Sequence, residues 1–261
     1  MTLKIKYNML KRWIYILLLI ASPLLAFSND GTNALFKKGN DQYQKGKYKD
    51  AQVTYQKLVD DGNLSIALYY NLGNAYYKTG DIAPALLYYE KAHKLSPGDE
   101  DINANIRLAN TKTADKIEAP QEFFITKWWH GFILALPADT WAIGGVLLIL
   151  AGFGLLILYR FSNSVGIKKT AFFSAIAALI IGVCATFLAG RQTHYFDSHH
   201  DAIIFSSTVT AKNAPSATGK NAFVLHEGTK VEILDNTGTW IRIRLVNGSE
   251  GWVTVGDAKE I

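Results

Sequence analysis

The fold is decided by residues 66–99, IALYYNLGNAYYKTGDIAPALLYYEKAHKLSPGD. The pattern of this stretch recurs 34 residues earlier in the chain, at Gly39 with Gly73, Gly46 with Gly80, Ala51 with Ala85 and Tyr55 with Tyr89. A period of this length is typical of a unit of two antiparallel helices. Gly80 supplies the positive φ that the turn needs, and Pro97 ends the second helix. We therefore predict two helix-turn-helix repeats over residues 33–64 and 66–99.

The residues at the key positions of this unit resemble those of the tetratricopeptide repeat. In the second copy these are Tyr69, Leu72, Gly73, Tyr76, Gly80, Ala85, Tyr89, Ala92 and Pro97. The first copy departs at Lys38 and Leu58. Because each repeat must bury a face against a neighbour, we expect an amphipathic helix over residues 99–117 to cap the pair. The resemblance implies an all-α tetratricopeptide array over residues 29–117.

The first helices of such an array line its concave face. The exposed positions there are Phe36, Asn40 and Tyr43 in the first copy, and Tyr70, Asn74, Tyr77 and Lys78 in the second. An asparagine at the same place in both copies suits an extended peptide, because an amide both donates and accepts hydrogen bonds. We expect these residues to form a peptide-binding groove. The alternative is that they are solvent-facing polar residues without a ligand.

The N-terminal segment has the layout of a secretory signal peptide. Residues 1–28 carry Lys4, Lys6, Lys11 and Arg12 with no acid, followed by an apolar run from Trp13 to Leu25. This is the order of a basic region and an apolar core that precedes a cleavage site. The alternative is an uncleaved membrane anchor. In either case we expect the chain that follows to be exported.

Two later runs without a charged residue, 141–159 and 171–190, are long enough to be transmembrane helices. The loop between them, residues 160–170, carries Arg160, Lys168 and Lys169 and no acid. Positive loops stay in the cytoplasm. We therefore predict a two-pass protein of the bacterial inner membrane, with both soluble domains in the periplasm.

Aromatic residues crowd the segment 118–140, before the first of these runs. They are Phe123, Phe124, Trp128, Trp129 and Phe132, and Leu134 adds to them. Tryptophans beside a membrane span usually mark the headgroup zone. We expect an interfacial helix on the outer leaflet. The alternative, a hydrophobic docking surface for another membrane protein, stays open.

The segment 191–201 contains three histidines and two aspartates, His194, Asp197, His199, His200 and Asp201. Imidazole is a common metal ligand, but the spacing matches no binding motif. We interpret this segment as a solvated linker and expect no metal and no cofactor. The single cysteine, Cys184, excludes an internal disulfide and a cysteine zinc site.

The last segment, residues 202–261, has the pattern of short β-strands. Apolar and polar residues alternate from Trp240 to Leu245, and Asn247-Gly248 is a hairpin signal. With the closing Gly251-Trp252-Val253, the segment resembles a bacterial SH3-like (SH3b) barrel, a domain that binds cell-wall peptides or proteins. We expect Trp240 and Trp252 on its binding surface. The alternative is that at least one of them fills the core.

The order of these parts resembles one family, the BatE-type component of the Bat aerotolerance proteins. Further matches are Ala104-Asn105-Ile106-Arg107 through Asp115-Lys116-Ile117, and the aromatic pairs Phe123-Phe124 and Trp128-Trp129. The resemblance implies membrane partners with von Willebrand A domains and, indirectly, a MoxR-type ATPase. It also implies a role in envelope stress or aerotolerance.

The composition and motifs favour a scaffold over an enzyme. The net charge of +5 comes mainly from the N-terminal segment, and no basic face indicates nucleic acid. No nucleophile–base set or paired carboxylates stand in a recognisable motif. We therefore predict a non-enzymatic, membrane-anchored scaffold that binds proteins and touches the lipid bilayer. The alternative is a peptidoglycan-targeting subunit of a cell-wall enzyme.

Overall fold

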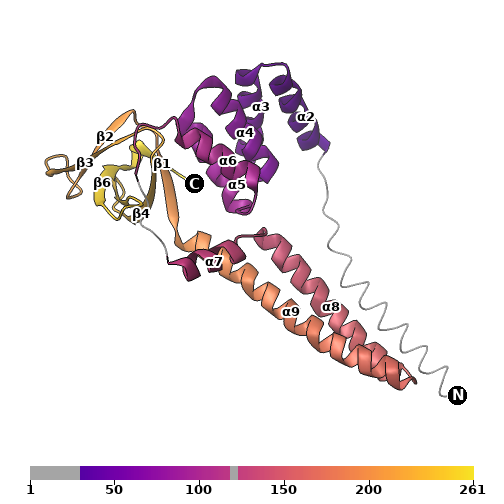
Figure 1. The fold of residues 1–261 in the computed structure, drawn as a ribbon. Helices are drawn as coiled ribbons and strands as arrows, with labels where there is room; N and C mark the ends of the chain where they lie inside the picture. The colour runs from indigo at the N-terminus through magenta and orange to yellow at the C-terminus, as the bar shows by residue number, and fades with distance from the viewer. Residues whose placement is uncertain (1–29, 118–122) are drawn as a thin grey trace. The chain divides into compact units, whose positions relative to one another are not determined.

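A computed structural model describes residues 30–117 and 123–261 of the protein (Figure 1). The segment expected to be a signal peptide, residues 1–28, lies outside the described residues. The described chain forms two compact units. One comprises residues 30–137 and 191–261, and the other contains residues 138–190.

The first unit begins with five helices. They are α2 (Asp30–Gln44), α3 (Tyr48–Asp60), α4 (Ile66–Thr79), α5 (Ile82–Leu95) and α6 (Glu100–Asn110), each packed on the next along the chain. The turns inside the two repeats carry Gly46 at φ 73° and Gly80 at φ 87°, backbone conformations that favour glycine. These helices form the α-helical array that the 34-residue period predicts.

The two helices of each repeat cross at a glycine. A Cβ on Gly39 would lie 2.4 Å from Cε1 of Tyr55, and a Cβ on Gly73 would lie 2.6 Å from Cδ1 of Tyr89. Both tyrosines are almost fully buried. In each repeat, the tyrosine ring therefore occupies the space that the glycine leaves at the helix crossing.

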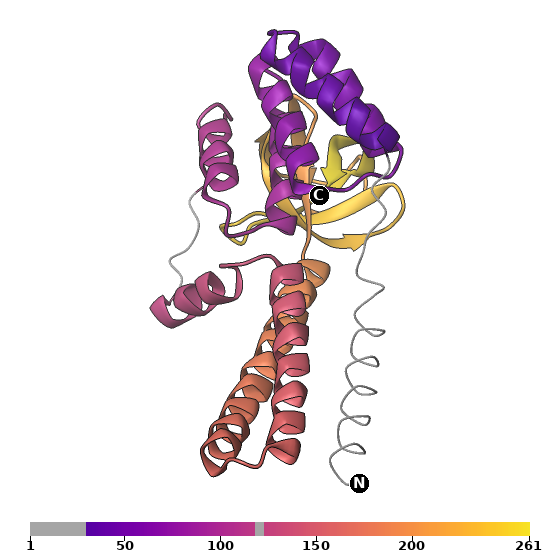
Figure 2. The same ribbon diagram turned by 90° about the vertical axis from the view of Figure 1, so that its right-hand side faces the viewer.

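Two long helices follow the short helix α7 (Phe124–Ile133). They are α8 (Ala138–Phe161) and α9 (Val165–Ser198), and both are long and apolar enough to cross a membrane. They lie side by side in antiparallel directions (Figure 2). A Cβ on Gly145 would lie 2.8 Å from the carbonyl oxygen of Gly182, and a Cβ on Gly182 would lie 2.8 Å from that of Gly145. The small residues thus allow close backbone contact.

Helix α9 is longer than the apolar run predicts. Of the expected loop 160–170, only residues 162–164 lie outside the helices, and the expected linker 191–201 is helical up to Ser198. Charged and polar side chains end an apolar run but do not end a helix. Residues 191–198 contain no glycine or proline that would break it. Most side chains of residues 191–200 are exposed, as expected of a solvated segment, but the segment is helical up to Ser198 and Gln192 in it is buried.

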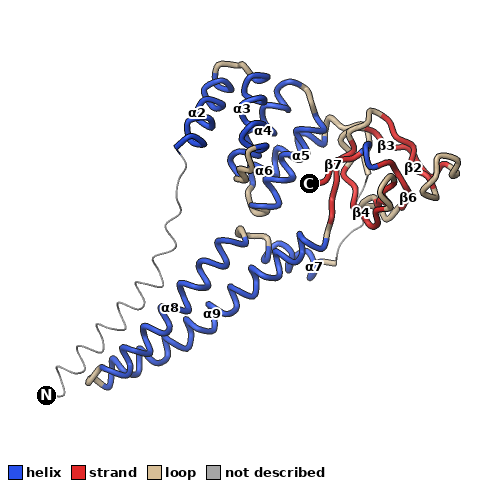
Figure 3. Tube along the Cα trace, turned by 180° about the vertical axis from the view of Figure 1, so that it is seen from behind, coloured by secondary structure: helices blue, strands red, loops and turns tan. Residues whose placement is uncertain are grey.

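The C-terminal part of the first unit is one antiparallel sheet (Figure 3). Its strands are β1 (His200–Ile204), β2 (Thr208–Lys212), β3 (Asn221–His226), β4 (Lys230–Asn236), β5 (Trp240–Arg244), β6 (Glu250–Thr254) and β7 (Ala258–Glu260). Their order in the sheet is β3-β2-β6-β5-β4-β1-β7. The core contains Ile204, Leu225, Val231, Ile241, Ile243 and Val253. The alternation in β5 therefore has the predicted sense, with Ile241 and Ile243 inside.

Candidate functional site: a helical face and a sheet face joined in one unit

The two groove asparagines accept equivalent pairs of hydrogen bonds. The hydroxyl of Tyr55 donates to Oδ1 of Asn40, and that of Tyr89 donates to Oδ1 of Asn74, each over 2.7 Å. A second donor reaches each oxygen from the next helix. Nδ2 of Asn71 lies 3.1 Å from Oδ1 of Asn40, and Nδ2 of Asn105 lies 3.0 Å from Oδ1 of Asn74. The structure therefore uses the asparagine oxygens inside the array.

This network changes what the asparagines can offer a ligand. Burial raises the pKa of Tyr55 to about 12, so its hydroxyl stays protonated and remains a donor. Burial also raises the pKa of Tyr89. Only the amide Nδ2 of Asn40 and of Asn74 is left for a peptide, and both side chains are half-buried. Their role in binding stays a prediction, but they also have a structural role that sequence reasoning missed.

A signal for this role is present in the sequence. Asn71 and Asn105 stand 34 residues apart, the same spacing as Asn40 and Asn74. Helix α6 is thus the first helix of a third, incomplete unit. Arg107 at its glycine position does not prevent it from supplying the hydrogen bond.

The remaining groove residues are aromatic or basic side chains on α2 and α4. The ring of Phe36 lies 6.0 Å from that of Tyr55, and the ring of Tyr70 lies 6.1 Å from that of Tyr89. The hydroxyl of Tyr70 also accepts from Nδ2 of Asn105. Tyr43, which packs edge-on to Tyr48, and Tyr77 are half-buried, and Lys78 is exposed. The face is mostly aromatic, with one cation at its edge.

The sheet packs directly on the helical array. Ile203 of β1 is 1% exposed and belongs to the cluster of Ala83, Leu86 and Leu87 of α5, rather than to the core of the sheet. Its neighbour Ile204 faces the other way, into that core. Strand β1 therefore buries both of its faces, one against α5 and the other in the core of the sheet.

The carboxylate of Asp115, in the segment after α6, accepts hydrogen bonds from the turn between β3 and β4. Oδ2 of Asp115 accepts from the backbone N–H of His226 over 2.8 Å and from Oγ1 of Thr229 over 2.6 Å. Its Oδ1 lies 2.8 Å from Nδ1 of His226. Burial raises the pKa of Asp115, but the hydrogen bonds from Thr229 and His226 outweigh that effect and hold the pKa below its usual value.

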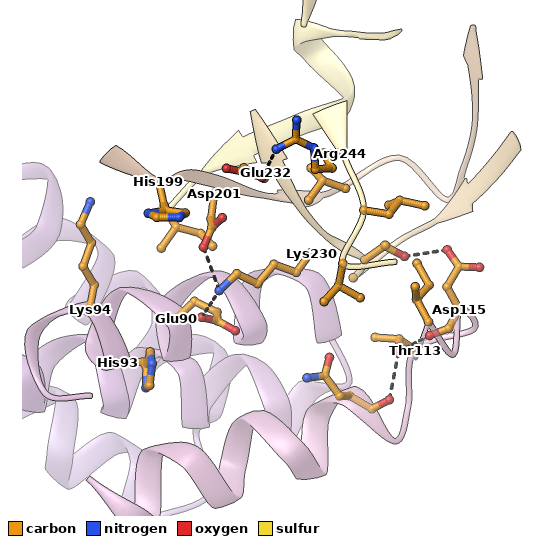
Figure 4. Close-up of a pocket in the computed structure, with 18 of the residues that line it drawn as sticks. Glu90, His93, Lys94, Thr113, Asp115, His199, Asp201, Lys230, Glu232 and Arg244 are labelled. Atoms are coloured by element: carbon orange, nitrogen blue, oxygen red, sulfur yellow. Dashed lines mark hydrogen bonds and ion pairs between the residues drawn. The ribbon is translucent and has the colours of Figure 1, made fainter. Parts of the chain in front are cut away.

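An ion triad makes the second polar link between array and sheet (Figure 4). Nζ of Lys230 lies 2.9 Å from Oε2 of Glu90 on α5 and 3.0 Å from Oδ2 of Asp201 on β1. The carboxylate of Glu90 is almost fully buried. Burial lowers the pKa of Lys230, but the two carboxylates outweigh it and raise the pKa above its usual value. Removing Lys230 would leave a buried charge without its partner.

A pocket of about 700 Å³ lies at this junction. Its walls include Glu90, His93 and Lys94 from α5, Asp115 from the segment after α6, and Lys230 and Arg244 from the sheet (Figure 4). Burial lowers the pKa of His93, whose Nδ1 is buried without a hydrogen-bond partner in the described structure. His199 and Asp201 also line the pocket. Within residues 30–117 and 123–261, no three metal-ligating side chains lie close enough to hold an ion.

The outer face of the sheet carries both tryptophans expected to bind a ligand. Trp240 is opposite Thr254, and Trp252 is opposite Arg242, on the side away from Ile241 and Ile243. Both tryptophans are half-buried, and neither belongs to the core cluster. The guanidinium of Arg242 lies 2.5 Å from Oε2 of Glu250. Neither tryptophan therefore fills the core of this sheet. Ligand binding at this face stays a prediction.

Comparison with known protein families identifies both modules. Residues 33–61 and 66–99 each match the tetratricopeptide repeat, and residues 207–258 match the bacterial SH3 domain. The chain therefore combines tetratricopeptide repeats with an SH3 domain, and both modules indicate a protein-interaction scaffold. No curated protein matches the chain.

Several solved structures resemble part of the chain weakly. PcrH from Pseudomonas aeruginosa is 17% identical with a TM-score of 0.32, and the match covers 62% of this chain and 98% of PcrH. The Yersinia enterocolitica type III secretion translocator chaperone SycD is 18% identical with a TM-score of 0.31, covering 63% and 91%. PcrH bound to the chaperone-binding region of PopD is 18% identical with a TM-score of 0.31, covering 67% and 95%. Similarity at this level carries no conclusion about function.

Proposed function

We propose that the protein is a membrane-anchored scaffold whose array and SH3 domain act as one binding unit. The carrying observation is the junction between them, where Ile203, Asp115 and Lys230 make apolar and charged contacts across the two modules. A junction of this kind holds the helical face and the sheet face in a set arrangement. A partner that touches both then loses less freedom on binding than it would on two tethered modules.

In this proposal α8 and α9 anchor the unit in the bacterial inner membrane, with both modules in the periplasm. The cations of the segment between the helices support this orientation. The expected partners are membrane proteins with von Willebrand A domains and, indirectly, a MoxR-type ATPase, in a Bat-type complex for envelope stress or aerotolerance. The order of modules along the chain supports this assignment.

The binding test uses a photo-crosslinking amino acid at two matched positions of the full chain in native membranes. Lys78 is an exposed lysine on α4, the first helix of the second repeat. Lys57 is also exposed, but it lies on α3, the second helix of the first repeat. We expect adducts with von Willebrand A-domain membrane proteins from position 78 and none from position 57. Equal adducts from both positions, or no adduct from position 78, would refute the groove.

The orientation test uses single cysteines in a Cys184→Ala background. Lys57→Cys, Ala217→Cys and Ser164→Cys each replace an exposed residue. In spheroplasts, an impermeant maleimide should label positions 57 and 217 and leave position 164 unlabelled. Labelling of position 164 alone would reverse the orientation.

A second function, targeting to peptidoglycan, is favoured by the half-buried Trp240 and Trp252 on the outer face of the sheet. Aromatic side chains of this kind provide large contact area with little loss of side-chain entropy. Sedimentation of the detergent-solubilised full chain with purified cell wall tests it. Co-sedimentation that is lost in Trp252→Ala, with unchanged photo-crosslinking at position 78, would assign the sheet face to the wall.

A further inference from the structure

Helix α7 presents aromatic side chains to the outside in a way that no other described helix of the first unit does. Phe123, at its N-cap, is 84% exposed, Phe124 is 80% exposed and Trp128 is 68% exposed. The tyrosines that pack inside the array, such as Tyr55 and Tyr89, are each 1% exposed. Leaving this much aromatic surface in water is unfavourable, because removal of apolar surface from water stabilises a protein.

The exposed side chains lie on one continuous side of the helix. At about 100° per residue, Phe124, Trp128, Phe132, Ile125 and Trp129 follow one another within an arc of roughly 140°. The rings of Trp128 and Phe132 are stacked with centroids 6.0 Å apart, and Trp129 lies 6.3 Å from Phe132. The arc is therefore one apolar surface.

The opposite side of α7 packs on its own unit. Ile133 is 7% exposed, and the ring of His130 lies 5.6 Å from that of Tyr195. Beyond the helix, a Cβ on Gly98 of the array would lie 2.4 Å from the carbonyl oxygen of Ala135. The side of α7 opposite the arc thus contacts the end of α9, and the segment that follows α7 contacts the array at Gly98, while the aromatic arc is exposed.

We propose that this arc is a lipid-binding surface, and that its partner is the interface of the bilayer. The inference rests on the membrane anchoring proposed above. Only residues 134–137 separate α7 from α8, so Ile133 and Ala138 can lie at most roughly 18 Å apart even when this segment is fully extended. The arc therefore cannot leave the vicinity of the membrane that α8 enters. Tryptophan is enriched in the headgroup zone, and tryptophan and phenylalanine are typical of the apolar face of helices that lie in the membrane interface.

The charge of the helix specifies the kind of lipid surface. Lys127 is the one side chain of α7 with a permanent charge, and it lies outside the aromatic arc. Strong binding to anionic headgroups usually needs a cluster of basic residues. Insertion of α7 is thus driven by its apolar side chains, and α7 should insert equally deeply into zwitterionic and anionic vesicles. Contact with the array through Gly98 would then hold the repeats at a set height above the lipid.

The experiment measures depth with a nitroxide on single cysteines of the full chain, in the Cys184→Ala background. The chain is reconstituted into phosphatidylcholine vesicles that contain no other protein, and then into vesicles with phosphatidylglycerol. Labels replace Phe124 and Trp128 on the arc. Lys127 is the control on the same helix, and Val53, an apolar residue 73% exposed on α3, is the control in the array.

We expect the labels at 124 and 128 to be more accessible to oxygen than to a polar nickel chelate, at a depth of about 5–10 Å. Labels at 127 and 53 should show the reverse, and the two lipid compositions should agree. A label at Leu147 of α8 separates the two proposals. If position 147 is deep while 124 and 128 are as water-accessible as 53, the lipid surface is refuted and anchoring stands. If position 147 is also in water, the anchoring itself fails.

Discussion

Replacing Ile203 with alanine should release the SH3 domain from the repeats without unfolding it. Ile203 is buried against α5, whereas the adjacent Ile204 is buried in the core of the sheet. Truncation of a buried isoleucine to alanine costs about 2–5 kcal/mol. Because about 1.4 kcal/mol corresponds to a factor of ten, the docked state should open roughly 30 to 3,000 times more often in Ile203→Ala.

The opening is measured by thiol labelling of a buried reporter. Thr113 is nearly buried, and a Cβ on Gly228 of the sheet would lie 2.7 Å from its Cγ2. Thr113→Cys in a Cys184→Ala chain should therefore react only when the two modules separate. Amide hydrogen exchange in β5 and β6 reports whether the sheet itself stays folded.

The matched control is Ile204→Ala. We expect Ile203→Ala to accelerate labelling at position 113 and to leave exchange in β5 and β6 unchanged. Ile204→Ala should accelerate exchange in these strands. If Ile203→Ala leaves labelling at the parent rate, or accelerates strand exchange as much as Ile204→Ala does, the reasoning about the junction is wrong.

Gly73→Ala should lower the free energy of unfolding of the array by about 1–3 kcal/mol, because the added Cβ would meet Tyr89. Urea unfolding measures this, and an unchanged unfolding midpoint would contradict the close helix crossing. Asp115 has a lowered pKa, so its contribution to docking is present above about pH 4 and is lost as the pH falls further. Pepsin cleavage between the modules should therefore rise in acid in the parent, and Asp115→Asn should lack this dependence. Gly182→Leu should separate α8 from α9, since its Cβ would already lie 2.8 Å from the carbonyl oxygen of Gly145; an unchanged spin-label distance in vesicles would refute the contact.

The sequence alone was sufficient for the fold class. The 34-residue spacing of Gly39 with Gly73 and of Tyr55 with Tyr89 predicts the helical array. Apolar length predicts α8 and α9, and alternation around Ile241 and Ile243 predicts the sheet. These signals succeed because they depend on residues close together in the chain, or on a repeat that presents the same local pattern twice.

The end of a helix was harder to predict. The apolar run stops at Gly190, but α9 continues to Ser198. The apolar run depends only on the hydrophobicity of the side chains. The helix depends on backbone hydrogen bonds and packing, which continue beyond the run. Gln192, Tyr195 and Phe196 lie in this extension, and the last two line the pocket at the junction.

Only the tertiary structure decided what the candidate site residues touch. The sequence places Asn40 and Asn74 on the first helices, but it does not show that Tyr55 and Tyr89 occupy their oxygens. The ion pair of Lys230 with Glu90 joins residues 140 positions apart. A contact over such a distance leaves no periodic trace, since it depends on how two separately folded surfaces meet.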